Sequence, residues 1–318
     1  RDRLYEYSKA IADFDKALEF DPFNPEVFMA RGDTKMHLKD FEGAVNDYTA
    51  SIDLKNTNSS AWLNRGIARH FLELNIEALE DLNKAVKLDY YNVESWVKRG
   101  MVKYELDSLE SALSDYNQAI KLDNENPFVY FQRGLTYLKL QDTTLALMDY
   151  NKVVEMEPTN ALTFYNIALI KSNQKKYDEA LEAYNTVVSI NPINVYTFYN
   201  RGIIYYLTGD YRKADKDFSK SIEIFPDFAG AYINRSSVRY KMGRNSAARE
   251  DEMTAKQIIA AVNGEVDNYE LLYKKYGDST YFNKIMEFEA DLVSGNIKKG
   301  RVQFERVSVE PKPNFFLV

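Results

Sequence analysis

Few residues in this chain have the types and spacing that catalysis or metal binding requires. Its 318 residues contain two histidines, His37 and His70, and no cysteine. A zinc site needs more ligands at matched geometry. The neighbouring acids Asp13 and Asp15 follow the pattern of a solvated helix face, and neither a phosphate-binding glycine loop nor a nucleophile elbow occurs. The sequence therefore predicts no catalytic residue, no metal site and no cofactor, and hence a protein that is not an enzyme.

Arginine and aspartate recur together at a fixed spacing. Six arginines are each followed 16 residues later by an aspartate: Arg31 and Asp47, Arg65 and Asp81, Arg99 and Asp115, Arg133 and Asp149, Arg201 and Asp217, Arg235 and Asp251. Where the series has Ile167 instead, the residue 16 later is Ala183. A lone buried charge is costly, so the joint loss of both charges indicates a partly buried ion pair. A phosphate-tracking ladder of arginines is the weaker interpretation, because each arginine has its own aspartate.

Composition excludes several classes of partner and structure. The formal net charge of -7 argues against nucleic acid, whose binding needs a basic stripe. Without cysteine, disulfides and thiolate metal sites are excluded. No apolar run approaches the roughly 18 to 20 residues of a membrane span. No signal peptide is recognisable, and we expect the chain to be a mature form or part of a longer one.

A repeat of 34 residues defines the elements that position these side chains. Alanine occupies one register eight times: Ala10, Ala44, Ala78, Ala112, Ala146, Ala180, Ala214 and Ala248. A second small position follows the arginines: Gly32, Gly66, Gly100, Gly134, Ala168, Gly202 and Ser236. An aromatic residue precedes each of these by four: Phe28, Trp62, Trp96, Tyr130, Phe164, Phe198 and Tyr232. Small residues let two antiparallel helices approach closely and large ones fill the space between neighbouring hairpins, so the pattern predicts stacked helical hairpins.

This pattern resembles the tetratricopeptide-repeat (TPR) family, whose unit has an early aromatic, a Leu-Gly pair, a central Ala, a later aromatic and a closing Pro. Arg mostly replaces the Leu here, and Asn56, Tyr90 and Asn124 replace the Pro. The resemblance implies an all-α, right-handed solenoid that binds other proteins. TPR folds host many functions, so the resemblance names no partner.

The repeat register also predicts how the chain is divided. We expect seven full repeats, at residues 25–58, 59–92, 93–126, 127–160, 161–194, 195–228 and 229–262. Residues 1–24 are the second helix of a truncated repeat, and we expect its first helix upstream of Arg1. Residues 263–318 form a tail outside the repeat, with a short helix expected at 269–276 and β segments at 284–291, 301–309 and 315–318.

In TPR proteins the first helix of each hairpin lines a concave groove that binds peptides. By this resemblance, nine residues are candidate contacts for a peptide: Asn166, Asn200, Asn234, Tyr165, Tyr199, Tyr196, Phe131, Phe128 and Tyr206. The aromatic members admit two interpretations, packing between hairpins or a hydrophobic peptide groove.

The three asparagines, spaced by 34 residues, resemble the asparagine ladder of the TPR array in O-linked N-acetylglucosamine transferase, where amides grip the main chain of an extended peptide. The amide can both donate and accept. The alternative is that Asn is simply common at this position. The carboxylate clamp of chaperone-binding TPRs is absent, because Lys is missing at repeat position 5 and no Lys or Arg stands at position 2.

We therefore expect a non-enzymatic scaffold that binds an extended peptide or a partner protein in its groove. The alternative is an assembly element that associates with itself or docks to an envelope component through its half repeat and the apolar terminus Phe315–Val318. An arm of a larger enzyme also remains open. A looser resemblance of the array and tail to exported TPR proteins of Gram-negative bacteria favours the periplasm or cell surface, without defining the compartment.

Overall fold

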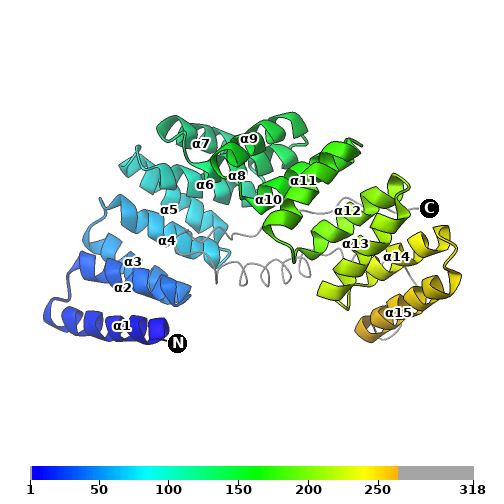
Figure 1. Ribbon diagram of the computed structural model, residues 1–318. Coiled ribbons are helices and arrows are strands. Elements are labelled where there is room, and N and C mark those ends of the chain that lie inside the picture. Colours follow the sequence, from blue (N-terminus) through cyan, green and yellow to red (C-terminus); the bar gives the residue numbers. More distant parts are fainter. Residues whose placement is uncertain (1, 264–318) are drawn as a thin grey trace. The chain divides into compact units, whose positions relative to one another are not determined.

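The computed structural model describes residues 2–263, and every regular element in this range is an α-helix (Figure 1). A single helix, α1 (Asp2–Phe20), comes first. Seven hairpins follow: α2 (Pro25–His37) with α3 (Phe41–Leu54), α4 (Ser59–Phe71) with α5 (Asn75–Leu88), α6 (Val93–Glu105) with α7 (Leu109–Leu122), α8 (Pro127–Lys139) with α9 (Thr143–Met156), α10 (Ala161–Asn173) with α11 (Tyr177–Ile190), α12 (Val195–Leu207) with α13 (Tyr211–Ile224), and α14 (Ala229–Lys241) with α15 (Asn245–Asn263). We call the two members of each hairpin its first and second helix.

The chain divides into two compact units, Arg1–Pro158 and Thr159–Val318. Helices α1 to α9 belong to the first unit and α10 to α15 to the second. Inside each unit a first helix packs against its own second helix and against the second helix of the preceding hairpin, as α4 does with α5 and α3, and α14 with α15 and α13. Each hairpin is therefore stabilised by its nearest neighbours.

Asparagine starts most of the first helices. Its side chain accepts a hydrogen bond from a backbone N–H in the first turn, which would otherwise have no partner. The capping residues are Asn24, Asn58, Asn92, Asn126, Asn160 and Asn194. Only α14 departs from this series: the residue at its start is Phe228, which is 6% exposed and packs in the core instead.

The turn inside each hairpin uses a left-handed backbone conformation at one fixed phase. Glycine holds this conformation at Gly209 and Gly243, with φ of 82° and 73°. In the other five hairpins a residue with a side chain holds it, with φ between 57° and 65°: Lys39, Glu73, Asp107, Gln141 and Lys175. These five positions therefore carry a backbone conformation that normally favours glycine.

The small residues of the repeat lie where two helices come closest. A Cβ added to Gly134 would sit 2.7 Å from Cε1 of Tyr150, and one added to Gly202 would sit 2.9 Å from Cε1 of Phe218. The eight-fold alanine register is buried in all its later members, with Ala44 to Ala248 at 0% exposure. In four hairpins an aromatic edge of the second helix thus occupies the space that glycine leaves on the first, and in the hairpin of α4 and α5 Leu82 does so.

The predicted fold class is confirmed: the described residues form seven helical hairpins after a leading single helix. The helix and β segments predicted within residues 263–318 lie outside the described residues. Over residues 2–263, no helix is both long and apolar enough to cross a membrane.

Candidate binding face of the first helices

Two of the three predicted ladder asparagines are held by tyrosines of the preceding hairpin. Nδ2 of Asn200, on α12, donates to the hydroxyl of Tyr165, on α10, at 2.8 Å. Nδ2 of Asn234, on α14, donates to the hydroxyl of Tyr199, on α12, also at 2.8 Å. Both bonds span 35 residues, one more than the repeat, so each links position 6 of a first helix to position 5 of the preceding first helix. Asn200 and Asn234 are only partly buried, and each amide therefore keeps one arm fixed to the protein while still reaching the surface.

Asn166 occupies the same register but has a different environment. Its side chain is on α10 and the residue is 1% exposed. Neither amide atom has a hydrogen-bond partner among the described residues. A buried amide without partners pays the cost of leaving water without compensation.

The aromatic candidates of the second unit pack against neighbouring rings. Tyr165 is 7% exposed and lies 5.9 Å from the ring of Tyr184. Tyr196 and Tyr199 are partly buried, with ring centroids 5.8 and 4.7 Å from Phe228. Tyr206 is partly buried beside Tyr211, at 5.7 Å. All four rings thus pack between helices, and only the partly buried ones also contribute to the surface.

In the first unit, Phe128 and Phe131 belong to the packing of α8. Phe131 is 7% exposed and its ring lies 5.6 Å from Tyr150. Phe128 packs beside a buried cluster that includes Val97 and Tyr116. These two residues and the candidates on α10, α12 and α14 lie in different units, so we treat the two sets separately.

The first unit has its own asparagine bonded across successive first helices. Nδ2 of Asn64, on α4, donates to Oδ1 of Asp33, on α2, at 2.9 Å. The hydroxyl of Tyr48 donates to the same oxygen at 2.7 Å. Burial, first of all, and the nearby Asp33 carboxylate raise the pKa of Tyr48. Asn64 stands at the same repeat position as Asn200, but a carboxylate holds it rather than a hydroxyl.

All six predicted arginine–aspartate pairs form. In each, Nε and one Nη of the arginine bond the two oxygens of the aspartate, as Arg65 does with Asp81 at 2.9 and 2.8 Å. The paired aspartates are between 1% and 4% exposed. This geometry is incompatible with arginines that track phosphates, because the Nε and Nη donors that would bind a phosphate already bond the aspartate.

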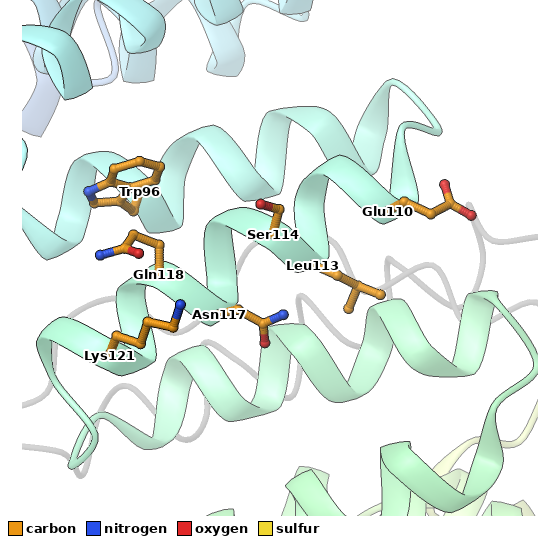
Figure 2. A pocket seen from close by; sticks show the side chains of 7 residues that line it. All are labelled: Trp96, Glu110, Leu113, Ser114, Asn117, Gln118 and Lys121. Carbon is orange, nitrogen blue, oxygen red and sulfur yellow. The ribbon is translucent and has the colours of Figure 1, made fainter.

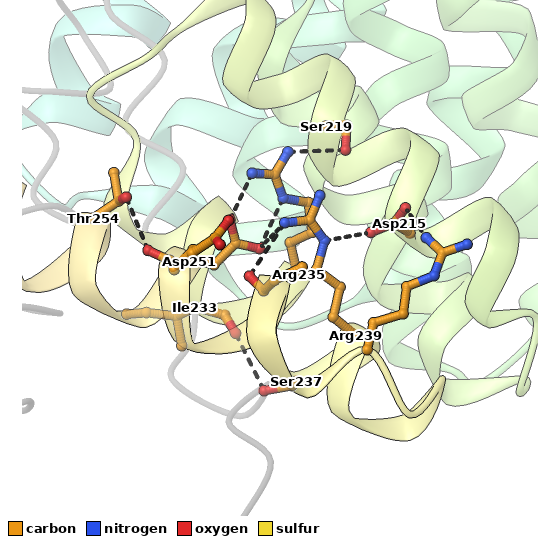
Figure 3. A network of polar contacts seen from close by, with 11 residues as sticks. Asp215, Ser219, Ile233, Arg235, Ser237, Arg239, Asp251 and Thr254 are labelled. Carbon is orange, nitrogen blue, oxygen red and sulfur yellow. Dashed lines mark hydrogen bonds and ion pairs between the residues drawn. The ribbon is translucent and has the colours of Figure 1, made fainter.

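Two features of these pairs were not deduced from the sequence. First, the remaining Nη of each arginine bonds a residue 16 positions earlier, on the preceding second helix, such as Asn185 for Arg201 or Ser219 for Arg235. Second, four of the aspartates also form an ion pair with a second basic residue, a Lys or Arg that stands four residues after the paired arginine. Figure 3 shows this in the last hairpin, where Arg239 reaches Asp251 at 2.9 Å and Asp215 at 3.0 Å. The first of these features could have been deduced from the polar residue that stands 16 positions before each arginine.

A shallow hollow of about 380 Å³ lies on the first unit, along α7 and beside α6 (Figure 2). The indole of Trp96 borders it from α6, and its other lining residues form one stripe of α7, among them Ser114 and Gln118. Asn117 in the same stripe already accepts a hydrogen bond from Arg133 at 2.6 Å. The hollow gathers no set of converging polar groups.

The histidines have local partners. Nδ1 of His70 lies 2.7 Å from Oδ1 of Asn75, and the ring of His37 stacks on Tyr7 at 5.1 Å. Within residues 2–263 no group of three or more His, Cys, Asp or Glu could hold a metal ion.

Comparisons with known families find repeats of one type. A model described as "TPR repeat" matches residues 100–141 and 172–209, and models described as "Tetratricopeptide repeat" match residues 129–160, 149–182 and 195–228. A search of curated proteins finds no match.

Among solved structures, the chain is similar to the C-terminal part of a TPR repeat-containing protein from Cytophaga hutchinsonii, with 16% identity over 72% of this chain and 94% of that one and a TM-score of 0.60. A TPR protein from Parabacteroides merdae is 20% identical over 79% of this chain and 96% of that one, with a TM-score of 0.57. YrrB, described as a TPR protein with an unusual peptide-binding site, is 23% identical over 58% of this chain and 95% of that one, with a TM-score of 0.50. These likenesses concern the fold.

Proposed function

The chain belongs to the tetratricopeptide-repeat family, and from that premise we propose that it binds an extended segment of a partner protein along the first helices of its second unit. TPR arrays are protein–protein interaction scaffolds, and this coarse function applies to the chain as a whole. We propose the seven repeats at residues 25–262 as the array that performs it. The finer proposal assigns the contact to Asn200 and Asn234, with Tyr196, Tyr199 and Tyr206 beside them.

The observation that supports this proposal is that two side-chain amides have the same position, burial and hydrogen bonding. Asn200 and Asn234 occupy the same position on α12 and α14, which contact each other in the second unit. Each amide is partly buried and bonded through Nδ2, while no described residue bonds its Oδ1. Two equivalent acceptors on successive helices suit a repeating ligand, and the main chain of an extended peptide is such a ligand.

The rings beside the amides favour apolar side chains in the ligand. Tyr196, Tyr199 and Ile203 all belong to α12 and are all partly buried. Tyr and aliphatic side chains of this kind contribute contact area at low entropic cost. Asn166 stands at the same repeat position but is a weaker candidate contact, because it is 1% exposed and a ligand could reach it only if neighbouring side chains moved.

The similarity to YrrB supports this proposal to the extent that a TPR array of the same fold is described as having a peptide-binding site. The position and chemistry of the site on this chain rest on its own residues.

The test is a selection of random peptides displayed on phage against the full chain. We expect convergence on extended peptides, and we expect the Asn200→Ala/Asn234→Ala variant to bind the selected peptides at least about 10-fold more weakly, the equivalent of losing one or two hydrogen bonds. The matched control is Asn151→Ala, an exposed asparagine of α9 outside the first helices, which should bind normally.

Failure to enrich any peptide would contradict the peptide-binding proposal. Enrichment of peptides that bind the double variant and the wild type equally would show that the chain binds peptides at another place. Circular dichroism melts of both variants establish that any loss of binding is not a loss of fold.

A second candidate function has one specific observation in its favour. Phe20 and Phe23, at the end of α1 and in the turn that follows, are 90% and 76% exposed. Large exposed apolar side chains next to one another mark association surfaces. If this end mediates assembly, light scattering should show a mass that rises with concentration, and Phe20→Ser/Phe23→Ser should abolish the rise. A constant monomer mass at high concentration would rule this function out.

A further inference from the structure

The tyrosine hydroxyls at the end of each asparagine bond provide a new element of the binding face. We infer that Tyr165 and Tyr199 are positioning residues that orient the amides of Asn200 and Asn234, so that each presents its Oδ1 as an acceptor to a main-chain N–H of the bound peptide. This inference rests on the proposed function and adds the chemistry of recognition: the ligand donates, and the protein accepts.

The hydrogen bond to tyrosine restricts each asparagine side chain. An asparagine side chain has two rotatable bonds, and an amide at a helix surface samples several orientations. In this structure Nδ2 of Asn200 and Nδ2 of Asn234 each lie 2.8 Å from a tyrosine oxygen, at the same 35-residue spacing. The hydroxyl takes one of the two N–H donors of the amide and so fixes the direction in which the Oδ1 acceptor points.

Both tyrosines are themselves held in place by packing. Tyr165 is 7% exposed and packs against Tyr184. Tyr199 packs against Phe218 at 5.9 Å and Phe228 at 4.7 Å. A hydroxyl on a ring that is packed in this way cannot follow the amide, so the amide must adapt to the hydroxyl.

Asn64 in the first unit has its amide in the same orientation. Its partner is the carboxylate of Asp33, at 2.9 Å, and an ionised carboxylate can only accept a hydrogen bond. The Nδ2 of Asn64 must therefore face its neighbour and the Oδ1 must face away. The same repeat position in two units thus turns its donor inward, once towards a carboxylate and twice towards a hydroxyl.

Asn166 illustrates the opposite case. Its amide has no hydrogen-bond partner among the described residues, and the residue is 1% exposed. We therefore limit the oriented pair to Asn200 and Asn234.

The experiment uses the full chain and one peptide obtained by the selection described above. Affinities are measured by fluorescence anisotropy for the wild type, Tyr165→Phe, Asn200→Ala and the double variant, and for the corresponding set at Tyr199 and Asn234. Tyr165→Phe should weaken binding about 2- to 10-fold, because a freed amide must be immobilised when the peptide binds. In the Asn200→Ala background the same change should have no further effect. Tyr205→Phe, at a partly buried ring of α12 that bonds neither asparagine and lies outside the proposed contact, is the matched control.

The donor chemistry is tested on the ligand. A series of the peptide, N-methylated at one main-chain nitrogen at a time, should contain two members with strongly reduced affinity for the wild type. One of these two should lose its penalty in Asn200→Ala and the other in Asn234→Ala. N-methylation removes a donor and leaves the side chains of the peptide unchanged.

The outcomes separate the two proposals. If no peptide is selected, or if Asn200→Ala and Asn234→Ala bind normally, the proposed function fails. If the asparagines matter but Tyr165→Phe and Tyr199→Phe bind like the wild type, or weaken binding equally without the asparagine, the positioning role is overturned while the proposed function stands. If no N-methylated peptide shows a penalty that depends on an asparagine, the amides do not accept from the main chain and the inference is wrong.

Discussion

The hairpin of α4 and α5 offers a strict test of the buried ion pairs, since the chain contains its own control. Asp81 is 1% exposed and accepts three hydrogen bonds, two from Arg65 and one from Arg69 at 2.7 Å. Asp81→Ala would leave Arg65, which is 8% exposed, without its counter-ion. Arg65 would keep its bond to Thr49, at 3.0 Å, and its place over the ring of Trp62.

Breaking a buried pair on one side costs about 3 to 5 kcal/mol, because the remaining charge is uncompensated. We expect about 3 kcal/mol for Asp81→Ala, the lower end, since the contacts of Arg65 with Thr49 and Trp62 remain. The double variant Arg65→Ile/Asp81→Ala copies the natural hairpin of Ile167 and Ala183, which are 9% and 7% exposed. Replacing a buried pair by apolar groups is often neutral, so the double variant should cost roughly 1 kcal/mol or less.

Arg69, which loses Asp81 in the double variant, has another acidic residue within reach, and the natural hairpin shows the equivalent pairing. In the natural hairpin Lys171 pairs with Glu179, eight residues later. Arg69 has Glu77 at the same spacing and already lies 3.3 Å from its carbonyl oxygen. We expect Arg69 to turn to the Glu77 carboxylate once Asp81 is gone.

Hydrogen exchange read by mass spectrometry is the appropriate assay, because a repeat array can open locally. A loss of 3 kcal/mol corresponds to exchange roughly 150-fold faster for the amides of α4 and α5. Exchange within about 5-fold of the wild type in Asp81→Ala, which is about 1 kcal/mol, would refute the reasoning. Faster exchange in the double variant than in Asp81→Ala would also refute it, because removing Arg65 as well should remove the uncompensated buried charge and restore stability.

Three further predictions follow from the same structure. Asn166→Leu should raise stability by about 1 to 3 kcal/mol in urea unfolding, because it removes a buried amide whose atoms have no partner among the described residues; a lower midpoint would mean that the amide is satisfied. Asn194→Ala should cost about 1 kcal/mol, because Oδ1 of Asn194 caps α12 through the Thr197 amide at 2.7 Å; Asn151→Ala serves as the control, and equal midpoints would contradict the cap. Burial raises the pKa of Tyr104 to about 12 and that of Tyr150 and Tyr184 well above its ordinary value near 10. The folded state therefore holds these protons more tightly, so stability is fully present below pH 10 and is lost as pH rises from there through 12; absorbance at 295 nm and helical circular dichroism should change together in that range, and complete tyrosine ionisation with an intact helical signal would contradict this.

Several parts of the structure could be predicted because they repeat. The alanine and glycine registers identified the places where helices approach closely, and the structure has aromatic edges there, such as Tyr150 against Gly134. The ion pairs could be predicted because one hairpin lacks both partners, at Ile167 and Ala183. A periodic sequence acts as its own set of comparisons, since every repeat must satisfy the same neighbours.

Other parts could not be predicted, because they depend on contacts between successive hairpins. The sequence offered nine candidate contacts as equals, yet Asn166, Tyr165 and Phe131 are nearly buried while Asn200, Asn234 and Tyr206 are partly buried. The bond from Asn200 to Tyr165 joins residues that are 35 positions apart in the chain, and it depends on the distance between α10 and α12. The same holds for the bond from each arginine to the preceding second helix.

The sequence by itself determined the class of fold, the length of its unit and the partners of its buried charges, because these follow from residue size and charge at a fixed period. Only the tertiary structure decided which amides keep a free acceptor and which aromatic rings are buried. Those properties depend on how closely one hairpin sits on the next and on which rotamer that distance allows, and no period in the sequence encodes either of them.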